Sequence, residues 1–438
     1  MLAIKLPGPL LVLGRASNIL GAVVPSSTTK RTIVSKTYFK EPENYKEPWP
    51  YKEKGYTRFN WPQDFTKNRL HQNSKLIVVE GNIGAGKSTV AAEIADQLGF
   101  LHMPEFRMEE ILIDRYGNDL RDYYHLFPKA FRIPDVNMFY ENPMDDNTAR
   151  MQFRIMECRF EQYINAVAHI FNTGQGVVLE RGFHTDFVFA NAMRVKDYIG
   201  PEFHKFYMYC RKRAIPLLRY WPHLVIHLDA SIGKCMERIK ERGNVNEIKT
   251  VDVEYLTAID QSYRDALREF KRHSKLLIYD WDVPGHADQI VADIEQLELD
   301  FFEWHSGDVH EEWHTPSDEF WYSHYRAQFT QKWPLLFKMF NDLRIHEVGE
   351  LYVDIQDLGH FLNTMKTQIL GGRCGYGYYP EKGDDKKAAM TVWKYNQNLP
   401  EPWFEYYWKD TYIHQIHSFE TYVDPAARSY NPDYLHHH

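Results

Sequence analysis

Short apolar runs alternate with helical stretches from about residue 75 to residue 297 of this chain. Five runs are rich in β-branched and other apolar residues and predict buried strands, at positions 75–80, 100–105, 176–181, 224–229 and 276–280. Between them, Val90, Ile94 and Leu98 recur at helical spacing, and residues 148–172 and 231–242 show the same periodicity. Strands that alternate with helices predict an α/β fold with a parallel sheet flanked by helices.

A glycine-rich segment follows the first predicted strand. Residues 81–89 (GNIGAGKST) satisfy the phosphate-binding pattern G-x-x-x-x-G-K-[ST] in full, between a strand and a helix as the pattern requires. Glycines let backbone N–H groups approach phosphate oxygens, and the N-terminus of the following helix attracts the same anion. The sequence therefore predicts a P-loop fold, with nucleotide-binding residues Gly81, Gly84, Ala85, Gly86, Lys87, Ser88 and Thr89. Whether a nucleotide occupies the loop is a separate question, because a fold does not fix a function.

Polar residues stand at the ends of two further predicted strands. Because the carboxyl ends of parallel strands meet in the ligand crevice, Glu105 is a candidate general base. Glu180 and Arg181 suit a place where Mg²⁺ meets a phosphate or sugar oxygen. On the predicted helix at 148–172, the Gln152 amide is suited to a base edge. Each of these residues also has a structural alternative. Glu105 would be a surface acid at a strand end, and Glu180 and Arg181 would form a salt bridge at the sheet edge. Gln152 would belong to an amphipathic helix that only packs.

Together these segments resemble the deoxyribonucleoside kinase family over about residues 74–300. The resemblance implies an ATP-like or deoxynucleotide-like ligand with Mg²⁺, held at the P-loop. It also assigns roles by position: catalysis to Glu105, Arg181 and Arg242, substrate binding to Gln152 and Glu247, and Mg²⁺ binding to Ser88 and Glu180. Residues 237–242 resemble the start of the arginine-rich lid of that family. Their basic stripe would otherwise be a solvated helix face.

One branch of the family is more similar still. Residues 173–182, 185–189 and 222–226 resemble the kinase-like accessory subunits of mitochondrial NADH:ubiquinone oxidoreductase, respiratory complex I. This resemblance implies a non-redox subunit on the matrix side of the inner membrane, held there by other complex I subunits and needed for assembly or stability. Those subunits are also associated with FAD, which nothing in these residues supports or excludes.

Two departures from the active kinases affect the expected chemistry. Gly182 stands where the family has a serine after Glu-Arg, and in the lid only Arg242 clearly remains, with Lys240 as a weaker substitute. Losing one such arginine can cost about 10³-fold in rate, and lysine cannot form the same two-pronged contact. We therefore expect phosphate binding to be kept and phosphoryl transfer to be impaired. The alternatives are an active mitochondrial kinase, which transfers the ATP γ-phosphate to a nucleoside 5′-hydroxyl, and a nucleotide sensor within the complex.

Composition narrows the range of partners. The net charge of −8 argues against a nucleic-acid-binding surface, which needs a basic footprint. The four cysteines form no CxxC pair and match no zinc spacing, so we expect reduced thiols. No apolar run approaches the roughly 20 residues that span a bilayer, so any membrane association is expected to be peripheral and through partners.

The N-terminal segment has a targeting composition. Residues 1–40 contain six Lys or Arg, many Ser and Thr, and no Asp or Glu, which is typical of a mitochondrial presequence. A secretory signal and a disordered tail are the alternatives. We place the presequence at 1–35 and an extended linker or partner-binding arm at 36–73, where several prolines favour extended backbone.

The character of the chain changes after the predicted kinase-like domain at 74–299. The extension at 300–438 holds seven of the eleven tryptophans, with helical spacing at about 328–343 and 358–370 and turn residues at 371–380. Aromatic residues are favoured at protein interfaces, so we expect an interaction region. The alternative is that they pack on the domain and enlarge it. The cluster of His305, His310 and His314 could bind a metal, but histidines among aromatic residues are more often surface or packing residues, and we favour that alternative.

Overall fold

The computed structural model describes residues 33–40, 45–57, 59–113, 119–299, 310–314, 318–340 and 343–364. Most of the predicted presequence lies outside these residues. So do His305 and the part of the C-terminal extension beyond residue 364, which includes the predicted turns at 371–380.

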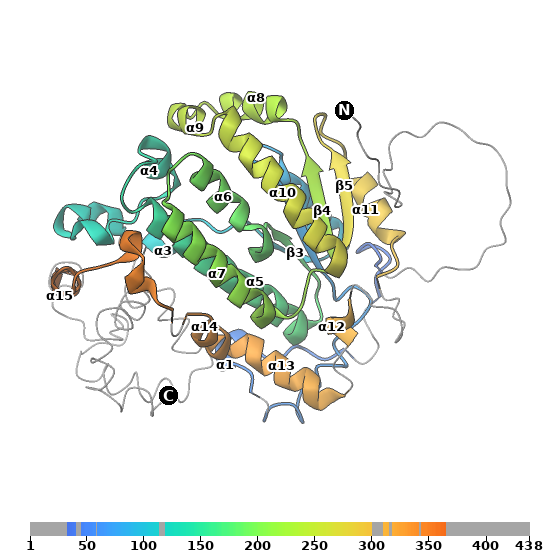
Figure 1. The fold of residues 1–438 in the computed structure, drawn as a ribbon. Coiled ribbons are helices and arrows are strands. Elements are labelled where there is room, and N and C mark those ends of the chain that lie inside the picture. The colour runs from blue at the N-terminus through green and yellow to red at the C-terminus, as the bar shows by residue number, and fades with distance from the viewer. Residues whose placement is uncertain are drawn as a thin grey trace.

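Five strands within the described residues form one parallel sheet in the order β2-β3-β1-β4-β5 (Figure 1). Their bounds are β1 Leu76–Gly81, β2 Leu101–Met103, β3 Val177–Glu180, β4 Leu224–Asp229 and β5 Lys275–Asp280. The five predicted strands and the α/β fold class are thus confirmed. Strand β2 is shorter than predicted, because Pro104 lacks the N–H group that would continue the ladder.

Helices cover both faces of the sheet. The α-helices of the central domain are α2 Lys87–Leu98, α3 Glu109–Leu112, α4 Val136–Glu141, α5 Thr148–Thr173, α6 Phe187–Val195, α7 Pro201–Leu218, α8 Ile232–Arg242, α9 Val245–Thr250, α10 Val253–His273 and α11 Ala287–Glu295. Short 3₁₀ helices are η1 Leu120–Leu126, η2 Lys129–Phe131 and η3 Phe183–Thr185. Right-handed crossovers place α2 on one face and α5, α7 and α10 on the other, since the chain moves along the sheet in opposite directions after β1 and after β2.

The described part of the C-terminal extension packs against the domain. It contains α12 Glu311–His314, α13 Glu319–Gln331, α14 Trp333–Phe340, η4 Ile345–Glu347, η5 Gly349–Leu351 and α15 Ile355–Thr364. Trp313 is buried, and its indole N–H donates to the Trp221 carbonyl at 2.7 Å. His310 is buried, and its ring is hydrogen-bonded to the His223 carbonyl at 2.8 Å, so it packs at the start of strand β4.

The single helix predicted at about 328–343 is wrong. The chain forms α13 and α14 instead, because Lys332 takes a left-handed backbone (φ 55°) and Pro334 is tolerated only in the first turn of a new helix. The second predicted helix, at 358–370, begins earlier than expected, at Ile355. Within the described residues, no helix is both long and apolar enough to cross a bilayer.

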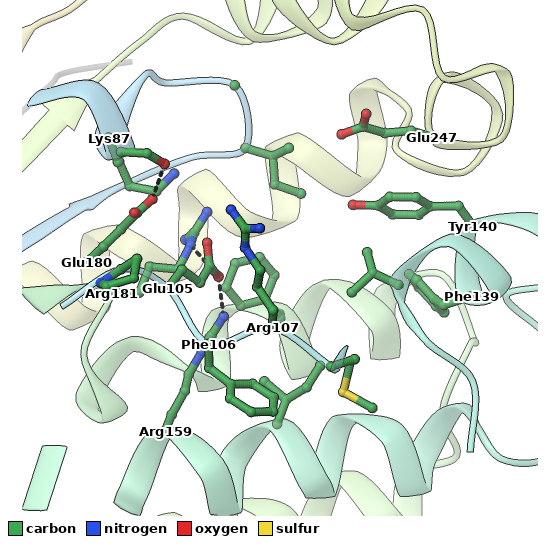
Figure 2. A pocket seen from close by; sticks show the side chains of 18 of the residues that line it. Lys87, Glu105, Phe106, Arg107, Phe139, Tyr140, Arg159, Glu180, Arg181 and Glu247 are labelled. Atoms are coloured by element: carbon green, nitrogen blue, oxygen red, sulfur yellow. Dashed lines mark hydrogen bonds and ion pairs between the residues drawn. The ribbon is translucent and has the colours of Figure 1, made fainter. Parts of the chain in front are cut away.

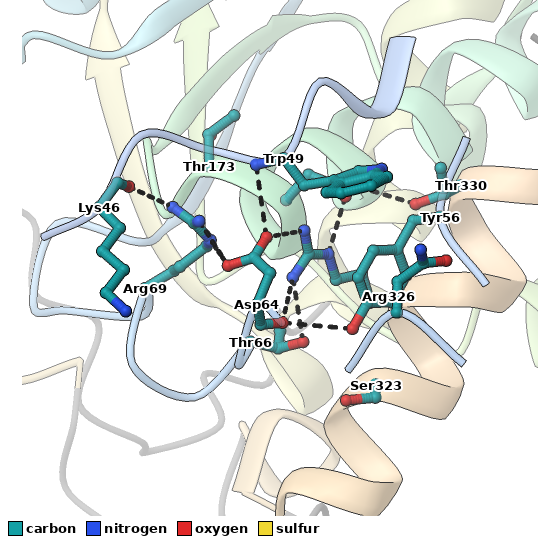
Figure 3. Close-up of polar contacts among 12 residues, drawn as sticks. Lys46, Trp49, Tyr56, Asp64, Thr66, Arg69, Thr173, Ser323, Arg326 and Thr330 are labelled. Atoms are coloured by element: carbon teal, nitrogen blue, oxygen red, sulfur yellow. Dashed lines mark hydrogen bonds and ion pairs between the residues drawn. The ribbon is translucent and has the colours of Figure 1, made fainter. Parts of the chain in front are cut away.

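A buried polar cluster ties the N-terminal segment to α13 (Figure 3). Asp64 accepts from Arg69 at 2.6 Å and from Arg326 at 2.6 Å. The Arg326 side chain is fully buried and lies 3.7 Å from the centre of the Tyr56 ring. The segment formed by residues 45–57 and 59–73, which includes the short helix α1 (Tyr51–Lys54), is therefore held against the chain's own domain. The domain boundaries at 35, 73 and 299 stay predictions.

Candidate functional site

A cavity of about 700 Å³ opens at the carboxyl ends of the strands (Figure 2). Most of the predicted site residues line it: Gly84, Gly86, Lys87, Ser88, Thr89, Glu105, Gln152, Glu180, Arg181, Arg242 and Glu247. Gly81 and Ala85 belong to the same glycine loop but are not among the lining residues. The structure therefore brings together groups that the sequence spreads over more than 160 positions.

The glycine loop has a backbone that only glycine accommodates. Gly81, Gly84 and Gly86 have φ values of 151°, 80° and 89°. A Cβ atom on Gly81 would lie 2.6 Å from the Leu228 carbonyl oxygen of the neighbouring strand. Helix α2 begins directly after this loop, at Lys87, so its positive N-terminal end faces the cavity. This arrangement suits a phosphate group.

Lys87 supplies the positive charge of the loop. Its side chain is buried, and its ammonium group donates to the Asn82 carbonyl at 2.8 Å. Burial, and next the nearby Arg181 charge, lower the pKa of Lys87 to about 7. A phosphate group in the cavity would restore the preference for the charged form, since an opposite charge raises the pKa of an ammonium group.

The pKa of Lys87 predicts a pH-dependent affinity for nucleotides. Above pH 7 the ammonium group loses its proton, so affinity for ATP should fall between pH 7 and pH 9, by at most about tenfold per pH unit. The second phosphate pKa, near 6, lies below this window. Isothermal titration calorimetry across the window tests this. The Lys87→Met variant should show a flat profile, and an equally steep profile in that variant would assign the titration to another group.

Ser88 and Glu180 form the part of the cavity that suits a divalent cation. The Ser88 hydroxyl donates to the Glu180 carboxylate at 2.6 Å. Hydroxyl and carboxylate oxygens are ligands that Mg²⁺ prefers, and this ion usually takes the remaining ligands from water and phosphate. These two residues would hold Mg²⁺ and so reduce the negative charge of a bound phosphate chain. No cluster of three or more His, Cys, Asp or Glu side chains suited to a metal occurs in the part of the chain that the structure describes.

Glu105 lies between two guanidinium groups at the centre of the cavity (Figure 2). Its carboxylate is 2.5 Å from Arg159 and 2.9 Å from Arg181. Burial alone would raise the pKa of Glu105, but the charges of Arg181, and then of Arg159, lower it to about 2. A carboxylate held in this way is ionised at neutral pH and accepts a proton poorly. The predicted role of Glu105 as a general base stays a prediction that this ion pairing disfavours.

Arg159, which lines the cavity, and its ion-pair partner Asp186 were not predicted as functional. Buried Asp186 accepts from Arg159 at 2.5 Å, from the Gln152 amide at 3.3 Å and from the Tyr207 hydroxyl. Burial raises the pKa of Asp186, and the Arg159 charge opposes that shift. Gln152 and Arg159 fall on one face of α5, seven positions apart, and that spacing could have indicated Arg159. No sequence signal placed Asp186 beside them.

The lid segment closes one side of the cavity. Arg242 is 3.1 Å from Glu247, so the one clearly retained lid arginine is paired within the lid. Arg238 donates to the Gly84 carbonyl at 3.2 Å and to the Trp281 carbonyl at 2.8 Å, and thus holds helix α8 against the glycine loop. Lys240 is exposed. Gly182 donates its backbone N–H to buried Glu80 at 2.8 Å, so the segment after Glu180 is held without a serine side chain.

The sequence model of the family described as deoxynucleoside kinase matches residues 77–316, which is more than half of the chain. The chain belongs to the deoxynucleoside kinase family. The resemblance to this family, expected from residues 81–89 and from Glu180 and Arg181, is thus confirmed. The roles expected of the individual site residues stay predictions.

Two mammalian proteins are similar to this chain over about half of its length. The chain is 33% identical over 246 residues to mouse NADH dehydrogenase [ubiquinone] 1 alpha subcomplex subunit 10, mitochondrial. The aligned region covers 55% of this chain and 67% of the mouse protein. The chain is 34% identical over 241 residues to the bovine protein of the same name, with coverage of 54% and 68%. Among solved structures, deoxyadenosine kinase from M. mycoides with bound dATP is 19% identical, with a TM-score of 0.38 and coverage of 50% of this chain and 96% of that one.

Proposed function

We propose that this chain is an accessory, non-redox subunit of mitochondrial respiratory complex I whose kinase-like domain binds a nucleotide. The observation that supports this most strongly is the identity of 33–34% to alpha subcomplex subunit 10 of two mammals, over two thirds of their length. In this proposal the domain serves assembly or stability of the complex. An association with FAD is an expectation from the resemblance alone.

The cavity supports nucleotide binding more than nucleotide turnover. The glycine loop, Lys87 and the N-terminus of α2 suit a phosphate chain, and the Ser88–Glu180 pair suits its Mg²⁺ ion. Against turnover, Glu105 is paired with two guanidinium groups. In the lid, Arg242 is paired with Glu247. Stabilising a transferring phosphoryl group requires free positive charge, which this arrangement limits.

The proposed location is the matrix side of the inner membrane, with attachment through other complex I subunits and no nucleic-acid partner. The basic, acid-free composition of residues 1–40 supports import into mitochondria. The net charge of −8 supports protein partners over nucleic acids.

Co-migration on a native gel tests the partner claim. The full-length chain, expressed with a small C-terminal tag in its own cells, should migrate with a band that oxidises NADH in the gel. Immunocapture through the tag should recover the same activity. A matched control is a tagged matrix protein of similar size. Migration of the tagged chain only as a free monomer or dimer would refute the proposal.

An active deoxynucleoside kinase is the second candidate, and the complete glycine loop with Lys87 and Ser88 favours it. Purified chain, incubated with γ-labelled ATP, Mg²⁺ and a panel of deoxynucleosides, should transfer little or no label under our proposal. Robust transfer that the Lys87→Ala substitution abolishes would instead establish the kinase.

A further inference from the structure

Helix α15 of the C-terminal extension packs on the segment that precedes one wall of the cavity. The Phe361 side chain is buried, with 1% of its surface exposed. Its ring stacks on Phe131 with centroids 4.1 Å apart and lies edge-on to Phe127 at 5.0 Å. Figure 1 shows α15 on the same side of the molecule as α3 and α4. The C-terminal extension, which kinase chemistry does not require, thus contacts the segment that precedes the cavity-lining helix α4.

The chain just before α15 is anchored to two helices of the domain. Arg150 of α5 donates to the carbonyl oxygens of Leu351 at 3.0 Å and Tyr352 at 2.7 Å. The Glu350 carboxylate accepts from the Gly200 backbone N–H at 2.8 Å, just before α7 begins. These contacts fix where α15 starts, so Phe361 reaches the same place on Phe131 whenever the extension is docked.

Residues 119–135 connect the packing site of Phe361 to the wall of the cavity. Arg121 pairs with Asp135 at 2.5 Å and lies 3.7 Å from Glu109, which lines the cavity. The Asp135 carboxylate accepts from the Met138 backbone N–H at 2.8 Å and so caps α4. Helix α4 contributes four lining residues, Val136, Asn137, Phe139 and Tyr140. The position of residues 119–135, on which Phe361 packs, therefore determines the position of helix α4 in the cavity wall.

The lid holds α4 from its other side. Thr250 donates to the Tyr140 carbonyl at 2.6 Å, and the Asn244 amide donates to the Asn137 side chain at 3.2 Å. Helix α4 is thus held between α9 of the lid and the segment that α15 supports. A shift on either side moves lining residues into or away from the cavity.

We propose that Phe361 is a positioning residue for the nucleotide cavity, and that docking of the C-terminal extension and nucleotide binding are energetically coupled through residues 119–141. This inference rests on the proposed nucleotide binding. Coupling of this kind is reciprocal: a docked extension raises nucleotide affinity, and a bound nucleotide stabilises the docked extension to the same degree. The nucleotide thereby favours one conformation of the extension surface.

The test uses the full chain and dATP with Mg²⁺ as the probe. Phe361→Ala should weaken dATP binding in calorimetry by at least about fivefold. The matched control is Phe329→Ala, which truncates an equally buried ring of the same extension, packed on Phe171 and Tyr220 away from residues 119–135. It should change the affinity less than about twofold, within the additivity expected of separate sites. Phe361→Leu should restore most of the wild-type affinity.

Hydrogen exchange gives the reciprocal measurement. Saturating dATP should slow amide exchange in residues 355–361 of the wild-type chain and leave it unchanged in Phe361→Ala. Equal affinities of Phe361→Ala and Phe329→Ala would overturn the coupling while leaving the proposed function intact. Failure of the wild-type chain to bind dATP would overturn both the nucleotide part of the proposed function and this inference. Should alanine unfold either variant, the exchange of residues 355–361 in the wild-type chain with and without dATP decides instead, and exchange that dATP leaves unchanged would overturn the coupling.

Discussion

Replacing Arg326 with methionine is expected to destabilise the protein by about 3 kcal/mol, because removing one member of a buried ion pair leaves the other charge without full compensation. The Arg326 guanidinium donates to Asp64 at 2.6 Å and to Asn172 at 2.7 Å, with none of its side-chain surface exposed. Arg69 still contacts Asp64, so the loss should fall at the lower end of the usual range. The midpoint of urea unfolding measures it, provided that the slope of the transition is unchanged.

The control for this prediction is Arg344→Met. Arg344 pairs with Glu347 at 3.2 Å, but 78% of its side-chain surface is exposed. Exposed pairs contribute about 0–1 kcal/mol, so this variant should unfold close to wild type. Similar small losses in the two variants would mean that the Arg326 cluster does not hold the N-terminal segment to α13.

Replacing Lys87 with methionine should weaken binding of ATP with Mg²⁺ by about a hundredfold. The ammonium group is placed to form charge-assisted hydrogen bonds to phosphate oxygens, which contribute about 1.5–3 kcal/mol each. Methionine has a similar length and removes a buried charge, so the fold should be at least as stable. Isothermal titration calorimetry gives the affinity, and thermal unfolding without nucleotide gives the stability.

A surface lysine provides the comparison for Lys87→Met. Lys234 of α8 pairs with Glu237 at 2.6 Å on the outside of the lid, and the Lys234→Met variant should bind ATP nearly as the wild type does. If the Lys87 and Lys234 variants lost affinity equally, the glycine loop would not be the phosphate site.

The central sheet could be predicted because its signal is local. Strands β1 and β3 are buried at every position and β4 at all but its last, so each appears in the sequence as a mainly apolar run. The glycine loop was predictable for the same reason, since its function depends on backbone conformation over nine consecutive residues.

The interior of the site could not be predicted in the same way. Glu105, Arg159 and Asp186 meet through the fold, from different elements, and no spacing in the sequence indicates their ion pairs. The Asp64–Arg326 contact joins positions 262 apart. The aromatic residues of the extension fit an interface and a core equally well in sequence. In the structure, Trp313 packs on the core against Trp221, whereas Phe320, Trp321 and Tyr352 are exposed.

The most direct test of the central claim is to delete this chain from the cells that produce it and measure the amount of assembled complex I in their mitochondria on native gels. The account predicts that the assembled complex decreases and that re-expression of the wild-type chain restores it. An unchanged amount of assembled, NADH-oxidising complex in mitochondria that lack the chain would contradict a role as an accessory subunit.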